Sequence, residues 1–128
     1  HKLQNIDLDK EHAEWEKLEQ LQGFKEIDGR YQCEFVVVGV GYDNRQEVIQ
    51  NVKKRKPLTI KETVFKREPA IEVLFEDQLI GYIAKEDIDR VLNIKDYIEH
   101  IEVERTYTNS KGDKGLYAKI VVSEKAFE

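Results

Sequence analysis

FVVVGVGY, from Phe35 to Tyr42, predicts a β-strand at the centre of this protein. Its four β-branched valines favour extended backbone, and apolar residues alternate onto both faces, which is typical of a central strand buried on both sides. Gly39 and Gly41 leave one face without side chains. They predict a sharp bend, or a place where another backbone or a ligand comes close. Tyr42 lies at the exit of the strand, with its hydroxyl near solvent.

Length and composition predict one domain over residues 1–128. The chain has 128 residues, of which 40% are hydrophobic, enough for a single core. No apolar run approaches the roughly 18 residues that a membrane span requires, so we expect no membrane association. Cys33 is the single cysteine, which excludes an internal disulfide and is typical of the reducing cytoplasm, where we expect the protein to act.

The charge is unevenly distributed along the chain. The net charge is -5, which argues against nonspecific nucleic-acid binding over the whole surface. The stretch from Lys53 to Arg67, however, contains seven basic residues and a single acid, Glu62, so its charge is +6. Such segregation can attract an anionic ligand to one face of an otherwise repelling protein. The alternative is an ordinary solvated, lysine-rich segment.

Several elements are predicted on either side of the central strand. An amphipathic helix over residues 7–22 carries Trp15 on its apolar stripe, and it either packs on the domain or binds a partner protein. Asp28-Gly29 predicts a two-residue hairpin turn into the central strand. After Tyr42, Asp43 and Gln46 have capping-box spacing at the start of a short helix, which Pro57 ends. Its buried face comprises Val48, Ile49 and Val52.

The second half of the chain predicts mostly short strands. Apolar and polar residues alternate over 58–65, which predicts a strand, and its outward-facing row includes Lys61, Phe65 and Arg67. Such a row of cations and an aromatic ring can stack bases and pair phosphates. It also fits an ordinary half-exposed strand. Strands follow at 70–75, 79–83, 101–107 and 116–122, with a turn at 76–78, a second short helix at 85–92 ended by Asn93, and a final hairpin. The fold class is therefore mainly β (α+β), a small barrel or half-barrel with two short inserted helices.

No catalytic or metal-binding motif is recognisable. His1, His12 and His100 are far apart, and no zinc-ligand spacing occurs. Cys33 precedes an apolar strand and is expected to fill the core. Glu102 and Glu104 share a strand face, where paired carboxylates are normally solvated. We therefore expect no enzyme activity, no cofactor, no metal and no catalytic residues.

Six motifs in order carry a resemblance to a known family. They are VVVGVGY (36–42), RQEVIQNV (45–52), LTI (58–60), KREP (66–69), AIEV (70–73) and IGYIAKE (80–86). In order and spacing this series resembles the HIRAN domain over about residues 35–92, with weaker agreement to the final hairpin. The resemblance implies a small SH3/OB-like β-barrel over 35–122. HIRAN domains occur beside Snf2-type helicases and nucleases, or alone in bacteria and phages.

The resemblance also implies a ligand, because the best understood HIRAN domains bind the 3′-hydroxyl end of single-stranded DNA and help to remodel stalled forks. Tyr42 matches the family tyrosine that stacks on the terminal base. Tyr82 and Lys85 fall in the segment that contacts the backbone and end phosphate. With the outward row of the 58–65 strand, the expected nucleic-acid-binding residues are Tyr42, Lys61, Phe65, Arg67, Tyr82 and Lys85.

The chain also departs from the family pattern. Gly41 stands where DNA-binding members have an arginine, and Pro69 is followed directly by Ala70, where the family has an NPYDPN-like loop that recognises the 3′-hydroxyl. The alternative is therefore a protein-interaction module that keeps the barrel and has lost 3′-end recognition. The expected partners are single-stranded DNA or a DNA 3′ end, or a protein bound through the Trp15 helix.

Overall fold

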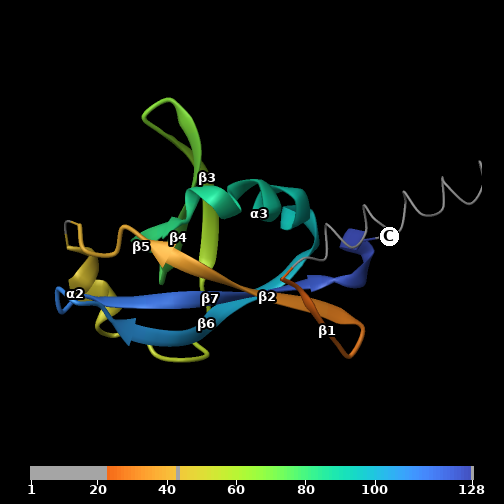
Figure 1. The fold of residues 1–128 in the computed structure, drawn as a ribbon, viewed down its shortest axis with the longest axis horizontal. Coiled ribbons are helices and arrows are strands. Elements are labelled where there is room, and N and C mark those ends of the chain that lie inside the picture. The colour runs from red at the N-terminus through yellow and green to blue at the C-terminus, as the bar shows by residue number, and fades with distance from the viewer. Residues whose placement is uncertain (1–22, 43, 128) are drawn as a thin grey trace, which may run out of the picture.

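The structure, a computed structural model, describes residues 23–42 and 44–127, which form an antiparallel sheet with few helices (Figure 1). The strands are β1 (Lys25–Ile27), β2 (Arg30–Val38), β3 (Thr59–Phe65), β4 (Glu68–Phe75), β5 (Gln78–Ile83), β6 (Ile98–Thr108) and β7 (Lys114–Ser123). The helices are α2 (Arg45–Ile49) and α3 (Ile88–Ile94), with 3-10 turns at Lys85–Asp87, Lys95–Tyr97 and Glu124–Phe127. The predicted mainly β class is confirmed. The predicted Trp15 helix over 7–22 lies outside the described residues.

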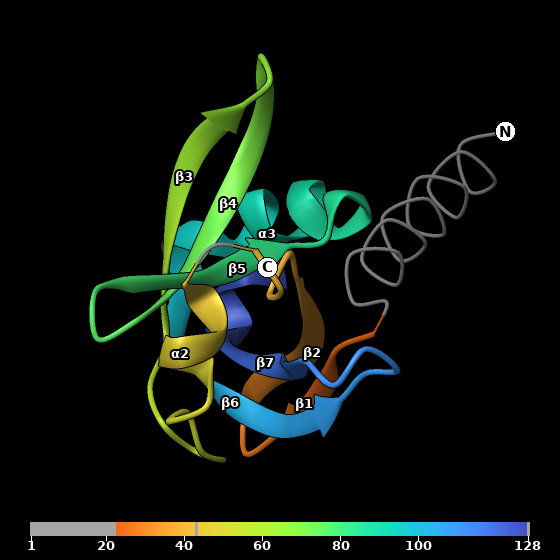
Figure 2. The ribbon, with the colours of Figure 1, turned by 90° about the vertical axis from the view of Figure 1, so that its left-hand side faces the viewer.

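Strand β2 joins the two halves of the sheet, whose order is β3-β4-β5-β2-β7-β6, with β1 paired to β2. Residues 30–36 of β2 pair with β7, and Val37 and Val38 then pair with β5. The β3-β4-β5 half consequently crosses over the β2-β7-β6 half (Figure 2). The central position predicted for this strand is confirmed.

The prediction that both faces of β2 are buried was wrong in part. Cys33, Phe35 and Val37 are buried, but Val36 is only partly buried and Val38 is 40% exposed. The strand also ends at Val38, before Tyr42, because Gly39 has a φ of +71°, a left-handed conformation that extended chain does not adopt. One face of the end of β2 is therefore open to solvent, and the chain turns sharply beyond it.

Three tight turns join neighbouring antiparallel strands. The predicted turn at Asp28-Gly29 is confirmed, and Glu76-Asp77 forms the predicted turn before β5, with both residues at positive φ in each turn. The third turn, Lys66-Arg67, has φ values of 51° and 67° and joins β3 to β4 without a longer loop. The β3–β4 hairpin projects beyond the rest of the fold in both ribbon views (Figures 1 and 2).

Both predicted short helices are present, with three differences. Helix α2 ends at Ile49, well before Pro57, and the predicted cap Asp43 lies outside the described residues. Ile49 and Val52 are buried as expected, but the Gln46 side chain does not cap α2. Its amide nitrogen donates to the carbonyls of Val40 and Lys114, both at 2.8 Å, and thereby ties α2 to the start of β7. The second helix continues past Asn93, because Ile94, which is only 4% exposed, packs into the core.

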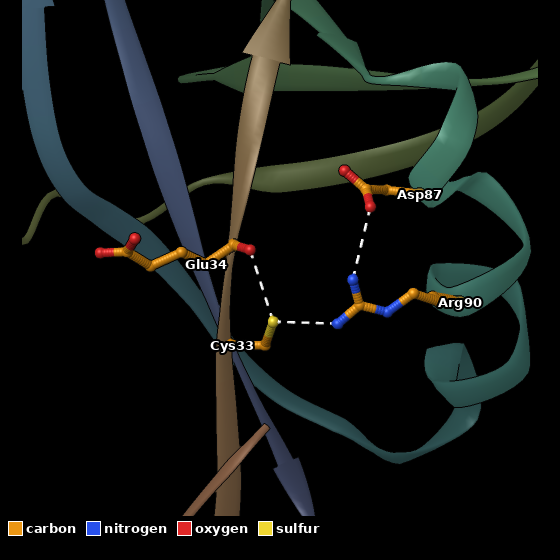
Figure 3. Close-up of polar contacts among 4 residues, drawn as sticks. All are labelled: Cys33, Glu34, Asp87 and Arg90. Carbon is orange, nitrogen blue, oxygen red and sulfur yellow. Dashed lines mark hydrogen bonds and ion pairs between the residues drawn. The ribbon is translucent and has the colours of Figure 1, made fainter. Parts of the chain in front are cut away.

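The core is one cluster of buried apolar side chains between the two halves of the sheet, and α3 covers part of it. Arg90 of α3 attaches this helix to β2 (Figure 3). Its Nη2 donates to Cys33 Sγ at 3.2 Å, its Nη1 lies 3.4 Å from Asp87 Oδ1, and its guanidinium lies 5.0 Å from the Phe35 ring centroid. The Cys33 thiol in turn donates to the Glu34 carbonyl at 3.4 Å.

The Cys33 thiol should be unreactive in the folded protein. Burial raises the pKa of Cys33, outweighing the attraction of the Arg90 charge, so the nucleophilic thiolate is disfavoured. We expect Ellman's reagent to modify Cys33 much more slowly in buffer than in urea, at a rate that follows the unfolded fraction. An equal rate in both conditions would mean that the thiol is open to solvent.

Gly81 should be essential for the crossing of the two halves. A Cβ at this position would lie 2.6 Å from both Val37 Cγ1 and the Val38 carbonyl oxygen. Because the backbone cannot move aside cheaply, Gly81→Ala should lower the free energy of unfolding by about 1–3 kcal/mol in urea denaturation. Gly41→Ala is the matched control, since its nearest neighbour is the Asp113 carboxylate, which can move; an equal loss there would contradict this explanation.

Candidate nucleic-acid interface

An open cavity of about 530 Å³ lies where the ends of β2, β4 and β5 meet the β3–β4 turn. Aromatic and cationic side chains from distant parts of the sequence line it, with apolar residues between them. The lining residues are Val38, Gly39, Tyr42, Arg45, Phe65, Lys66, Glu68, Pro69, Ala70, Tyr82, Ile83, Lys85 and Ile88.

Four of the six residues predicted to bind nucleic acid line this cavity, namely Tyr42, Phe65, Tyr82 and Lys85. The ring centroids of Phe65 and Tyr82 lie 5.9 Å apart. Tyr42 is 69% exposed and Phe65 is 55% exposed, so both rings offer a free face to a ligand. Tyr42 and Tyr82, the two tyrosines expected from the resemblance to bind DNA, therefore line the same cavity.

The other two predicted residues lie outside the cavity lining. Lys61 is directly opposite Glu72, and Glu72 is directly opposite Tyr82, so all three side chains share one face of the sheet. Arg67 does not continue this row, because it occupies the second position of the tight β3–β4 turn. Lys61 is thus a neighbour of the cavity, whereas Arg67 lies at the tip of the hairpin.

Arg45 is a central residue of this site that the sequence did not single out. Its guanidinium lies 5.8 Å from the Tyr42 ring centroid and 5.2 Å from that of Tyr82, and its Nη1 donates to the Gly39 carbonyl at 2.6 Å. The left-handed turn at Gly39 brings the first residue of α2 back over Tyr82. A Cβ at Gly39 would lie 3.2 Å from Arg45 Nη1, so the glycine also makes room for the guanidinium.

Lys66 and Glu68 complete the electrostatics of the cavity. Lys66 Nζ lies 5.4 Å from the Phe65 ring centroid, which places a second cation beside the exposed aromatic face. Glu68 is an acid at the rim, and its Oε2 lies 3.0 Å from Lys85 Nζ. Both side chains of this pair are mostly exposed, so water and salt screen it strongly. A ligand phosphate can therefore compete with Glu68 for Lys85.

The described residues include no group of three or more His, Cys, Asp or Glu side chains able to hold a metal ion. His100 stands beside Glu102 at 3.7 Å, while His1 and His12 lie outside the described residues. Within 23–42 and 44–127, no helix has the length and apolar character needed to cross a membrane.

Comparison of the chain with models of protein families, with curated proteins and with solved structures found no match. The residues themselves define an antiparallel β fold whose open cavity combines exposed aromatic rings with arginine and lysine side chains.

Arg45 should stabilise the turn between β2 and α2. Arg45→Lys cannot keep both the hydrogen bond to Gly39 and the planar contacts with the two tyrosines, so the free energy of unfolding should fall by about 1–3 kcal/mol. Urea denaturation measures this loss. Glu47→Ala, at an exposed position of the same helix, is the control and should change stability by less than about 0.5 kcal/mol. Similar losses in both variants would contradict a specific role for Arg45.

Proposed function

We propose that this chain is a HIRAN-like module that binds single-stranded nucleic acid, in particular single-stranded DNA or DNA ends, without catalysis. The observation that carries the proposal is the meeting of three aromatic rings, Tyr42, Phe65 and Tyr82, in one open cavity with Arg45 and Lys85. These rings come from three separate segments of the chain. Together they form a surface suited to flat bases and negatively charged backbone.

Base stacking supports the proposal in energetic terms. Stacking of a base on an aromatic side chain contributes about 1–3 kcal/mol, and it tolerates different sequences because every base has a π face. Tyr42 and Phe65 are already exposed, so a base can cover them without rearrangement of the core. Arg45, Lys66 and Lys85 surround the rings and can approach phosphates, so binding should weaken as salt rises.

Hydrogen bonds at the start of β3 support the barrel-like architecture in this proposal. Leu58 N donates to the Ile101 carbonyl at 2.9 Å, and Val103 N donates to the Lys56 carbonyl at 3.0 Å. The chain entering β3, at one end of the strand order, is therefore bonded to β6 at the other end. This contact between the two ends of the strand order supports the proposal of a small HIRAN-like barrel.

The cavity chemistry supports binding rather than catalysis. Among the described residues that line it, the polar side chains are tyrosine, arginine and lysine, with Glu68 as the one carboxylate, and Glu68 pairs with Lys85. Both side chains of that pair are mostly exposed, so neither has the desolvated setting that activates a lysine nucleophile or a general base.

Oligonucleotide binding tests the proposal. Fluorescence anisotropy with short single strands should show binding that weakens with salt, and Tyr42→Ala or Phe65→Ala should each weaken it by about 1–3 kcal/mol. Lys85→Ala should reduce the slope of log K against log salt by about 0.7. Tyr97→Ala is the control, because Tyr97 is also exposed but does not line the cavity.

The choice of ligand distinguishes end recognition from general single-strand binding. Single strands ending in a 3′-hydroxyl or a 3′-phosphate, and a blunt duplex, should be compared at two salt concentrations. We expect the single strands to bind more tightly than the duplex. Unchanged affinity in the Tyr42 and Phe65 variants would remove the cavity as the binding surface.

The second candidate is a protein-interaction module. Strand β4 runs through Pro69 and Ala70 without interruption, so the segment that recognises the 3′-hydroxyl in the family has no counterpart between them. Apolar exposure at Val64 (69%) and Val38 (40%) also suits a protein partner. This function would be favoured if single strands failed to bind at low salt.

A further inference from the structure

The cations between Lys53 and Arg67 are distributed along the whole length of β3. Lys53, Lys54, Arg55 and Lys56 form the basic loop before the strand, Lys61 lies within it, and Lys66-Arg67 is the turn at its far end. In Figures 1 and 2, β3 runs from this loop to the projecting tip of the hairpin. The cations of this stretch therefore extend from one end of β3 to the other and do not cluster at one site.

Among the residues that the structure describes, these cations have no carboxylate partner in an ion pair, in contrast to many other cations of the fold. Within the described residues, none of the seven makes an ion pair, while Arg30, Lys85, Arg90, Lys95, Arg105 and Lys119 all do. Glu62, the one acid of the stretch, is paired with Lys95 Nζ at 2.9 Å, and the hydrogen bond that Lys95 donates to Glu62 raises the pKa of Lys95. The negative charge of Glu62 is thus balanced by Lys95, a residue outside the basic stretch.

The basic loop has a fixed backbone. Arg55 N donates to the Val103 carbonyl at 2.8 Å, and the Lys56 carbonyl accepts from Val103 N at 3.0 Å. Arg55 holds a φ of +72°, which these two hydrogen bonds to β6 stabilise. The exposed cations of the loop therefore project from an ordered position, so a bound polyanion would not have to order this backbone.

The edge of β3 that faces away from β4 offers further donors. Strand β3 lies at one end of the strand order, so beyond its start one of its edges is without a neighbouring strand among the described residues. Backbone N–H groups commonly donate to phosphate oxygens. Such an edge can therefore follow a sugar–phosphate backbone beside the cationic side chains.

We propose that β3 is a track for the backbone of an extended single strand, from the aromatic cavity at Phe65 to the basic loop at Lys53–Lys56. This inference rests on the proposed function and specifies its substrate as a strand several nucleotides long, and not an isolated end. A strand of seven residues spans about 23 Å, which at the 3.4 Å rise of stacked nucleotides corresponds to at most about seven nucleotides.

The dependence of affinity on length tests the track. A four-nucleotide oligothymidylate should occupy the cavity alone, and a twelve-nucleotide one should reach the basic loop. The longer ligand should bind more tightly and with a steeper salt dependence. Lys53→Ala with Lys54→Ala should reduce its salt slope by about 1.4 and its low-salt affinity by about tenfold, and should leave the four-nucleotide ligand unaffected.

The matched control removes two exposed lysines elsewhere, Lys25→Ala with Lys125→Ala, which changes the net charge equally. If the longer ligand binds no more tightly than the shorter one, or if both double variants weaken it alike, the track is wrong and the cavity stands. If the unmodified protein binds neither ligand, the proposed function fails and the track with it.

Discussion

The fold depends on a change of partner within one strand. β2 is bonded to β7 over its first seven residues and to β5 over its last two, so it is the element that both halves of the sheet share. The halves can cross there because Gly81 of β5 has no side chain to meet Val37 and the Val38 carbonyl. The same crossing leaves the outer face of Val38 uncovered, and the cavity forms beside it.

The candidate site follows from the way the chain leaves that crossing. A left-handed residue at Gly39 stops the strand and reverses the chain, so that Tyr42 and Arg45 return toward Tyr82. The opposite wall of the cavity comes from a different source, the β3–β4 hairpin, which contributes Phe65. Two turns, one at Gly39 and one between β3 and β4, therefore bring the site residues together. The geometry of the site depends on these turns as much as on the core.

Sequence patterns over a few residues predicted the elements whose conformation depends on neighbouring residues in the chain. Asp28-Gly29 and the alternating patterns of the later strands were sufficient to locate hairpins, since turn preference and two-residue periodicity act over a few residues. The end of β2 was missed because four valines around Gly39 look like continuous strand. Lys66-Arg67 was missed as a turn because neither residue is typical of one. Arg45 was missed because its contacts depend on the path of the chain after Gly39.

At the tip of the β3–β4 hairpin, the residues that would best fit the backbone conformation are not the ones that carry positive charge. Lys66 and Arg67 both adopt left-handed backbone, which costs an ordinary residue about 1 kcal/mol relative to its preferred conformations. Asn-Gly would adopt this turn more easily but would remove two positive charges from the projecting tip of the β3–β4 hairpin. Conformational stability and attraction for anions are therefore in direct competition at these two positions, and a more thermostable version of this hairpin would be electrostatically weaker.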